Sequence, residues 1–329
     1  MKNNQIGIIG IGYWGTNIIN VLQRFKIKKI YCYDVNHQNL IEIKKKFPFV
    51  KIVKELNEFI KIKHDGVVIA TSTSTHFEIA KKCLDYGHNI FIEKPVTNSF
   101  KKLNQLKNIA KKNKKIIMGG YIYNYNVYVE YIKKILDKKL LGPLKYVSFE
   151  RLNLGPVRND ISCIWDLASH DISTCLYLFG KKPKIINAYG HSLLKKKIFD
   201  ISNIILKIAK IKIEIKSSWL NPEKIRKLVI IGQKKMLLFN EMDKINPILI
   251  YDKFASYPKT SEFKKDFFTP KANIYLGKTF SPKIKFLSPL DKEMKHFLEC
   301  INKKKQPITS ADYSLKVMEI LENIQRKTI

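Results

Sequence analysis

A glycine-rich turn near the N-terminus constrains the fold of this chain more than any other feature. The turn runs from Gly10 to Gly15, follows an apolar run at 5–9 and precedes helically spaced apolar residues at 16–25. Glycines at this spacing occur by chance in many chains, but a strand before them and a helix after them are typical of a dinucleotide-binding unit. There, backbone N–H groups at the helix start hold the pyrophosphate. The residues expected to contact a dinucleotide are Gly10, Gly12, Tyr13, Trp14 and Gly15.

An acidic residue follows the next predicted strand. The apolar run at 29–33 ends in Asp34, about 20 residues beyond the glycine turn, where a carboxylate accepts hydrogen bonds from the adenosine ribose. A carboxylate at this place would repel the 2′-phosphate of NADP. Asp34 therefore predicts NAD as the cofactor.

Two regions of different pattern follow one another along the chain. Strand and helix patterns alternate over 5–120, which predicts parallel strands joined by crossover helices. Strand-like runs with short turns fill 184–250 and favour an antiparallel sheet. We predict an α/β chain with a doubly wound Rossmann domain at 1–121, and an α+β domain at 122–329 with a large, mostly antiparallel open sheet.

The last part of the chain carries two further expectations. Residues 253–283 show no clear period and are predicted as loops. Helices are expected at 290–302 and 310–326, the second beginning near a Thr-Ser pair that can cap it.

The composition is ordinary for a globular protein apart from its charge. The chain has 329 residues, is 45% hydrophobic and carries a formal net charge of +33. A basic face can bind nucleic acid or membrane phosphates, but these lysines are spread along the whole chain. We interpret them as solvated faces and expect neither nucleic acid nor membrane as a partner.

The cysteines and the apolar runs point to a cytoplasmic protein. The five cysteines show no grouping typical of a disulfide framework or a zinc site, so no metal is expected. No apolar run approaches the roughly 18 residues of a membrane span, and no signal peptide precedes the first strand.

A hydroxyl-rich loop follows the predicted strand at 66–70. Ligands of doubly wound sheets lie beyond the carboxyl ends of the strands, so this loop would border the cofactor. An ordinary helix N-cap explains the same residue types about as well. The residues taken as cofactor contacts here are Thr71, Ser72, Thr75 and His76.

Glu93-Lys94-Pro95 follows another apolar strand, at 89–93. Pro95 restricts the backbone of Lys94 and could direct its side chain to the ligand edge, with a cis bond as one way of doing so. A lysine there can stabilise the alkoxide that develops as a hydride leaves a secondary alcohol. The alternative is a surface lysine in a lysine-rich chain, with Glu93 and Lys94 making no cofactor contact.

Asp166 and His170 lie four residues apart on a predicted helix at 164–179, so their side chains would share one face. Histidine can accept a hydroxyl proton near neutral pH, and a nearby carboxylate can orient it and stabilise its cation. A helix-capping aspartate and a buried structural histidine are the alternative.

Taken together, these motifs resemble the Gfo/Idh/MocA family of oxidoreductases, named after glucose-fructose oxidoreductase and inositol dehydrogenase. The resemblance covers nearly the whole length and implies a catalytic group of Lys94, Asp166 and His170. It also implies a Rossmann domain followed by an open sheet that often builds dimers or tetramers.

Four stretches, Tyr125-Asn126, 151–155, 165–171 and 218–224, look like the branch that acts on nucleotide sugars in surface-polysaccharide synthesis. This branch includes UDP-N-acetylglucosamine and UDP-N-acetylglucosaminuronate 3-dehydrogenases. Only five of the 61 basic residues are arginines, and a retained arginine suits a diphosphate because of its planar fork. The substrate contacts expected on this basis, besides the catalytic group, are Tyr125, Asn126, Arg151 and Asn153 from these stretches, and Arg158 as a further retained arginine.

The chain departs from the family pattern at Ser72, Tyr121 and Val127, where proline, histidine and proline are usual. These changes bear on substrate choice more than on the type of reaction. The sequence therefore favours an NAD-dependent dehydrogenase. Its substrate would be the secondary hydroxyl at C3 of a UDP-linked amino sugar or of the corresponding uronate. The second interpretation is a dehydrogenase of a free cyclitol or monosaccharide. The third is a catalytically silent protein that binds NAD or nucleic acid.

Overall fold

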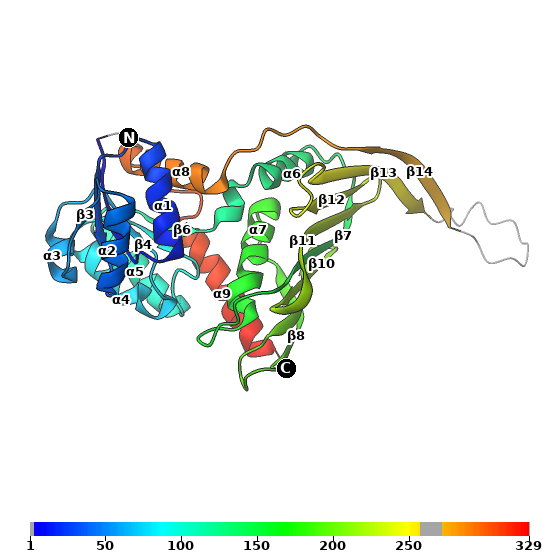
Figure 1. Cartoon of the computed structure of the whole chain (residues 1–329). Coiled ribbons are helices and arrows are strands. Elements are labelled where there is room, and N and C mark those ends of the chain that lie inside the picture. The colour runs from blue at the N-terminus through cyan, green and yellow to red at the C-terminus, as the bar shows by residue number, and fades with distance from the viewer. Residues whose placement is uncertain (1–2, 257–271, 329) are drawn as a thin grey trace, which may run out of the picture. The chain divides into compact units, whose positions relative to one another are not determined.

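The structure is a computed structural model that describes residues 3–256 and 272–328, and its chain divides into two compact units (Figure 1). The first unit comprises Met1–Asn126 and Leu287–Glu322. The second comprises Val127–Phe286 and Asn323–Ile329. The sequence predicts a single boundary after residue 121, whereas the chain returns to the first unit after residue 286. The return follows from α8 (Pro289–Lys303), whose apolar face packs into the first unit.

The first unit contains a six-stranded sheet in the order β3-β2-β1-β4-β5-β6, and every neighbouring pair is parallel. The strands are β1 (Gln5–Ile9), β2 (Lys29–Tyr33), β3 (Lys51–Ile52), β4 (Gly66–Ile69), β5 (Asn89–Glu93) and β6 (Ile117–Gly120). The crossover helices are α1 (Tyr13–Arg24), α2 (His37–Lys46), α3 (Leu56–Lys61), α4 (Thr73–Asp85) and α5 (Phe100–Lys112). This is the doubly wound order predicted from the alternating pattern.

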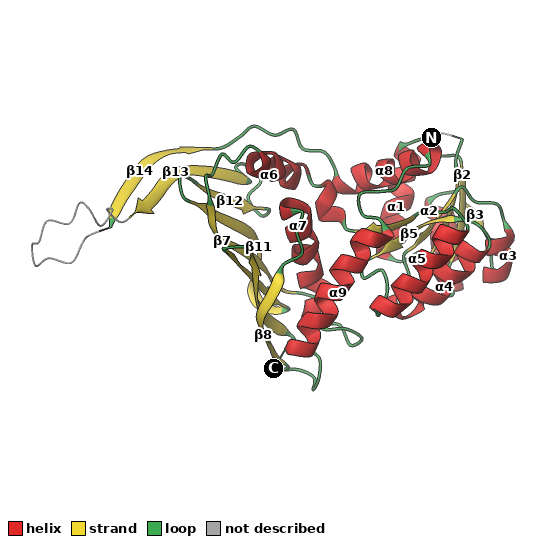
Figure 2. Ribbon diagram, turned by 180° about the vertical axis from the view of Figure 1, so that it is seen from behind, coloured by secondary structure: helices red, strands yellow, loops and turns green. Residues whose placement is uncertain are grey.

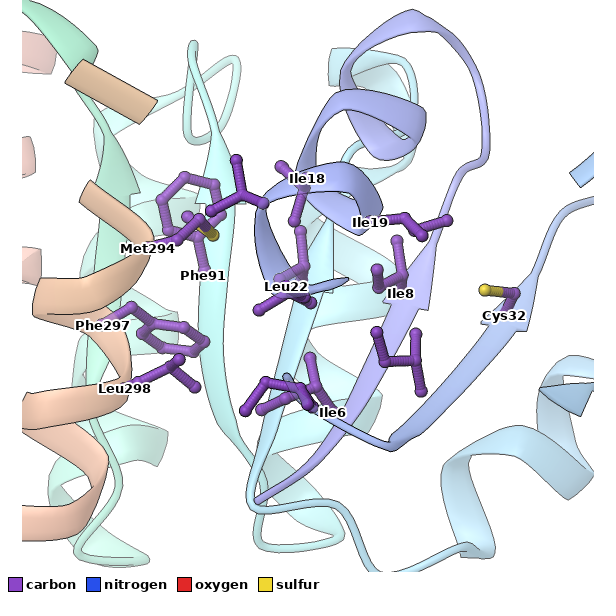
Figure 3. Close-up of a cluster of buried hydrophobic side chains, with 14 of the residues drawn as sticks. Ile6, Ile8, Ile18, Ile19, Leu22, Cys32, Phe91, Met294, Phe297 and Leu298 are labelled. Atoms are coloured by element: carbon purple, nitrogen blue, oxygen red, sulfur yellow. The ribbon is translucent and has the colours of Figure 1, made fainter. Parts of the chain in front are cut away.

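The core of the first unit joins segments far apart in the sequence. Figure 3 shows Met294, Phe297 and Leu298 of α8 beside Phe91 of β5 and Leu22 of α1. All five side chains are almost completely buried. Burial of side chains of this size stabilises a fold by about 1.5–3 kcal/mol each, so α8 is held firmly against the sheet.

The second unit contains an eight-stranded sheet in the order β14-β13-β12-β11-β7-β10-β9-β8. Its neighbours are antiparallel except for the parallel pair of β10 and β7. The strands are β7 (Leu144–Leu154), β8 (Lys184–His191), β9 (Ile201–Ile208), β10 (Ile211–Ser218), β11 (Leu220–Gly232), β12 (Met236–Asn240), β13 (Ile248–Ser256) and β14 (Asn273–Phe280). The predicted α/β fold class, with a parallel and a mostly antiparallel sheet, is confirmed.

Helices cover one face of the second sheet. Figure 2 shows α6 (Val127–Asp137) and α7 (Ser169–Phe179) along that face. A π-helical turn, η2 (Ile164–Ala168), leads into α7, and the 3-10 turn η1 (Ile122–Tyr125) ends the first segment of the first unit. The last helix is α9 (Ala311–Lys327).

The expectation of loops over 253–283 is wrong for the part that the structure describes. β13 continues to Ser256, and residues 273–280 pair with it as β14. The rings of Phe254 and Tyr275 stack across the pair with centroids 5.0 Å apart. The apolar side chains of β14 are largely exposed, so no alternation of buried and exposed residues marks it as a strand. Residues 257–271 lie outside the described part of the chain.

Among residues 3–256 and 272–328, the structure has no helix that combines the length and the apolar character needed to cross a bilayer.

Candidate functional site

The glycine turn joins β1 to α1 in a way that needs glycine at two positions. Gly10 has φ +90°, and a Cβ there would lie 2.7 Å from the Ala70 carbonyl oxygen. A Cβ at Gly15 would lie 2.0 Å from the Gly10 carbonyl oxygen. Larger residues at these positions would push the strand and the helix apart.

Gly12 has a different role, because a Cβ there would meet nothing within 4 Å. Gly12 is the N-cap of α1, no side chain caps that end, and the first turn of the helix carries no acidic residue. The helix start therefore presents N–H groups and a positive dipole end toward open space, which suits a pyrophosphate. The neighbouring Tyr13 and Trp14 are 77% and 37% exposed, so both can contact a bound molecule. These residues fit a dinucleotide.

Asp34 lies at the carboxyl end of β2 and ties this end to the glycine turn. Its Oδ2 accepts a hydrogen bond from the Ile11 N–H at 2.6 Å, and its Oδ1 accepts one from the Asn36 N–H at 2.8 Å. Each carboxylate oxygen can accept a second hydrogen bond, so the geometry is compatible with a ribose hydroxyl as a further donor.

The hydroxyl-rich loop leads from β4 into α4, as the sequence suggested. Ser72 is the N-cap of α4 but makes no side-chain cap hydrogen bond. The Thr71 and Thr75 hydroxyl oxygens lie 2.8 Å apart, and the Thr75 hydroxyl also donates to the Ser72 carbonyl. These three exposed or half-buried residues remain proposed cofactor contacts.

His76 is fully buried, and the structure gives its ring two partners in the backbone. Nδ1 lies 2.9 Å from the Pro95 carbonyl oxygen, and Nε2 lies 3.0 Å from the Thr71 carbonyl oxygen. The ring thus links the Thr71 loop and the Pro95 loop. A contact of His76 with the cofactor stays a prediction.

Lys94 follows β5 at the same sheet edge, and the Lys94–Pro95 peptide bond is cis. Because β1, β4 and β5 are parallel neighbours, their carboxyl ends meet at one edge of the sheet. The ligands of such sheets bind outside this edge. Lys94 thus lies at the same edge of the sheet as the glycine turn.

Glu93 of this motif is half-buried and interacts with a buried carboxyl group, Glu293, that could not be predicted from the sequence. Burial raises the pKa of Glu93 to about 7, although Lys94 lowers it. Burial and the nearby Glu93 raise the pKa of Glu293 on α8 well above its usual value. Glu293 is 1% exposed, and its Oε1 has no hydrogen-bond partner among the described residues. Its one signal in the sequence is a glutamate on the apolar stripe of a helix.

In the second unit, Asp166 lies in η2 and His170 is the second residue of α7. The helix predicted at 164–179 thus starts as a π-turn, a rare feature that is frequent at functional sites. Asp166 Oδ2 accepts a hydrogen bond from the Trp219 indole Nε1 at 3.1 Å. Its Oδ1 lies 3.9 Å from Arg158 Nη1. Asp166 is therefore held by groups from two other segments.

Arg151 was expected to bind substrate, but its guanidinium lies in a buried ion pair. Nε and Nη2 donate to the Asp171 carboxylate at 2.7–3.2 Å, and Arg151 is 6% exposed. Burial raises the pKa of Asp171, while Arg151 lowers it. Arg151 thus has a buried structural partner, and its contact with substrate stays a prediction.

The other expected substrate residues differ in exposure. Arg158 forms two hydrogen bonds with Asp160, and its side chain is 30% exposed. The Asn153 side chain accepts a hydrogen bond from Arg226. Tyr125 and Asn126 of the first unit are 3% and 5% exposed, and the Tyr125 hydroxyl lies 3.2 Å from the Thr309 hydroxyl. Of the two arginines expected to contact substrate, Arg158 is more exposed than Arg151.

No group of three or more metal-binding side chains occurs in the described ranges, 3–256 and 272–328.

Comparisons with known proteins show the family of this chain. Residues 4–121 match the model of the oxidoreductase family with an NAD-binding Rossmann fold, and residues 129–238 match the Gfo/Idh/MocA C-terminal domain. The chain belongs to the Gfo/Idh/MocA family. Its first domain is the family's NAD-binding domain, and the NAD cofactor predicted from Asp34 is supported by this match.

Two relatives carry names that bear on the substrate. The chain is 27% identical over 203 residues to UDP-N-acetylglucosamine 3-dehydrogenase of Acidithiobacillus ferrooxidans, covering 58% of this chain and 59% of that protein. It is 24% identical over 201 residues to myo-inositol 2-dehydrogenase of Thermotoga maritima, covering 59% and 60%. The chain thus matches about three-fifths of the length of each.

The solved structure of the Acidithiobacillus ferrooxidans enzyme has the same fold. It superposes with a TM-score of 0.82 at 19% identity, over 100% of this chain and 98% of the other.

Proposed function

We propose that the protein is an NAD-dependent dehydrogenase that oxidises a secondary hydroxyl of a UDP-linked amino sugar or its uronate, at C3, in the synthesis of a surface-polysaccharide sugar. The observation that carries the proposal is the position of Lys94. Its cation follows β5 at the sheet edge that also bears the glycine turn and Asp34. A family oxidoreductase with a lysine at this edge has the charge needed beside a developing alkoxide.

Each side chain has a separate task in the proposed reaction. NAD, when bound, supplies the acceptor for the hydride that leaves the carbinol carbon. Lys94 donates a hydrogen bond to the carbinol oxygen and stabilises its negative charge, while the His170 imidazole accepts the hydroxyl proton. Asp166 orients His170 and stabilises the imidazolium. The products are a keto sugar, NADH and a proton.

Arg158 is the proposed contact for the substrate diphosphate. Its planar guanidinium is partly exposed and can bind phosphate oxygens in a bidentate manner. Asn153, Tyr125 and Asn126 are kept as further proposed contacts. The named similarity to a UDP-N-acetylglucosamine 3-dehydrogenase supports a nucleotide sugar of this class.

The experiment is NADH formation by the purified full-length protein with NAD and either UDP-N-acetylglucosamine, its uronate or myo-inositol. We expect turnover with a UDP-sugar and a large loss of kcat in Lys94→Ala and in His170→Ala. If these two residues act on one hydroxyl, the double variant will lose much less than the product of the two single losses. Wild-type activity in His170→Ala would refute the proposal that His170 accepts the hydroxyl proton.

A cyclitol substrate is the second candidate, favoured by the similarity to myo-inositol 2-dehydrogenase. In that case myo-inositol would be oxidised with a higher kcat/KM than any UDP-sugar, and Arg158→Ala would leave turnover unchanged. Steeply salt-dependent DNA binding without turnover would instead support the silent, nucleic-acid-binding alternative.

A further inference from the structure

The proposed reaction needs the Asp166 carboxylate in a defined orientation, and its own backbone does not provide one. The Asp166 N–H bonds the Ser162 carbonyl at 3.1 Å as the chain enters the π-turn η2. The orientation must come from groups that contact the carboxylate.

Trp219 is one group that can orient this carboxylate. It lies between β10 and β11, is 1% exposed, and its backbone N–H bonds the Asp200 carbonyl at 3.0 Å. The indole Nε1 is a donor only, and it lies 3.1 Å from Asp166 Oδ2. A large ring fixed by two strands thus directs its one polar atom at the carboxylate.

Arg158 contributes less to the orientation. Its Nη1 lies 3.9 Å from Asp166 Oδ1, beyond hydrogen-bond distance, and its Nε and Nη2 already donate to Asp160. Its side chain is 30% exposed, whereas Trp219 is enclosed. The Trp219 indole therefore holds the Asp166 carboxylate by a hydrogen bond from a buried ring, whereas the Arg158 guanidinium is a more exposed positive charge near the same carboxylate.

We propose that Trp219 is a positioning residue for Asp166, and that its indole N–H holds the carboxylate in the orientation that supports His170. This inference rests on the proposed function for its effect on turnover. The hydrogen bond itself can be tested without turnover.

The first test is the NMR spectrum of the full-length protein with labelled indole nitrogens. Its three tryptophans give three indole signals, and Trp165→Phe and Trp219→Phe assign them. We expect Asp166→Ala to move the Trp219 indole proton upfield, because a charge-assisted hydrogen bond is lost, and to leave the Trp14 signal in place. An unchanged Trp219 signal would overturn the proposal. This variant keeps Trp219 and its packing.

The second test is the kinetics of Trp219→Phe, which removes the N–H but keeps an aromatic ring. We expect kcat to fall about tenfold with KM for NAD unchanged, since a hydrogen bond to a charged group is lost. Trp165→Phe is the matched control, next to Asp166 in the same π-turn, and should retain kcat. A wild-type kcat in Trp219→Phe would overturn the proposal. If the wild type turns over none of the sugars, the proposed function fails, and the indole signal alone then decides the role of Trp219.

Discussion

At the scale of single residues, the positions of the glycine turn, Asp34 and Lys94 at the ends of strands could be predicted from local sequence patterns, while their contacts with cofactor and substrate stay predictions. Gly10 has the positive φ that glycine tolerates, and Asp34 directly ends a strand. The surroundings of Arg151 and His76 could not be predicted. Their partners are Asp171, 20 residues from Arg151, and the Pro95 carbonyl, 19 residues from His76. No local sequence pattern indicates that Arg151 or His76 is buried against its partner.

Replacement of Asp34 by serine should change the cofactor preference. The repulsion of a 2′-phosphate and two backbone hydrogen bonds disappear together. We expect KM for NAD to rise about tenfold and the ratio of kcat/KM for NADP to that for NAD to increase. Asp85→Ser is the control, because Asp85 forms an exposed pair with Lys81. An unchanged ratio in Asp34→Ser would contradict the ribose assignment.

Arg151→Met should destabilise the fold, because it leaves Asp171 buried without its cation. We expect a loss of about 3–5 kcal/mol in the free energy of unfolding in urea. Arg24→Met, which breaks an exposed pair with Asp291, should cost less than about 1 kcal/mol. If Arg151→Met instead keeps wild-type stability and raises KM for the sugar, Arg151 contacts substrate after all.

At the scale of secondary-structure elements, the periodic helices and the parallel strands of the first unit follow from sequence. Two elements do not. The π-turn η2 requires a backbone hydrogen-bond pattern that apolar spacing does not encode, and β14 exposes its apolar side chains. α8 could be predicted as a helix, but its packing against β5 and α1 could not, because those contacts span most of the chain.

The carboxyl pair between β5 and α8 should give the protein a distinct pH dependence. The folded state raises the pKa of Glu93 from 4.5 to about 7 and that of Glu293 upward, so it binds more protons than the unfolded state in this window. Stability therefore falls as pH rises from about 4.5 through about 7. Glu293→Gln should flatten this fall and be more stable than the wild type above pH 7.

Glu299→Gln is the control, since Glu299 is exposed on the same helix and lies near Lys295. Urea unfolding across this pH range measures both variants. A slope in Glu293→Gln that equals the wild-type slope would show that the pair does not titrate as described.

At the scale of the whole molecule, the two sheets and the family could be predicted from the sequence. The return of the chain to the first unit at residue 287 could not. The eight-stranded sheet leaves apolar side chains exposed on its outer strands, including Ile186, Leu276 and Phe280 at 49%, 75% and 58%. Exposed apolar residues in such number are typical of an interaction surface.

We therefore expect a homodimer or homotetramer in solution, as the family resemblance also suggests. Light scattering of the full-length protein after size exclusion should give two or four times 38.4 kDa. Leu276→Lys should shift the mass toward the monomer, while Lys278→Ala, on the same strand, should not. A monomeric wild type at micromolar concentration would contradict this expectation.

The central claim is that Lys94 and His170 serve the oxidation of a sugar hydroxyl by NAD. Its most direct test is the rate of NADH formation from NAD and UDP-N-acetylglucosamine or its uronate, measured for the wild type and for Lys94→Ala. The account predicts turnover by the wild type and a loss of at least about a hundredfold in kcat for the variant, since the group opposite the developing charge is removed. No NADH from any UDP-sugar, or an equal rate in Lys94→Ala, would contradict it.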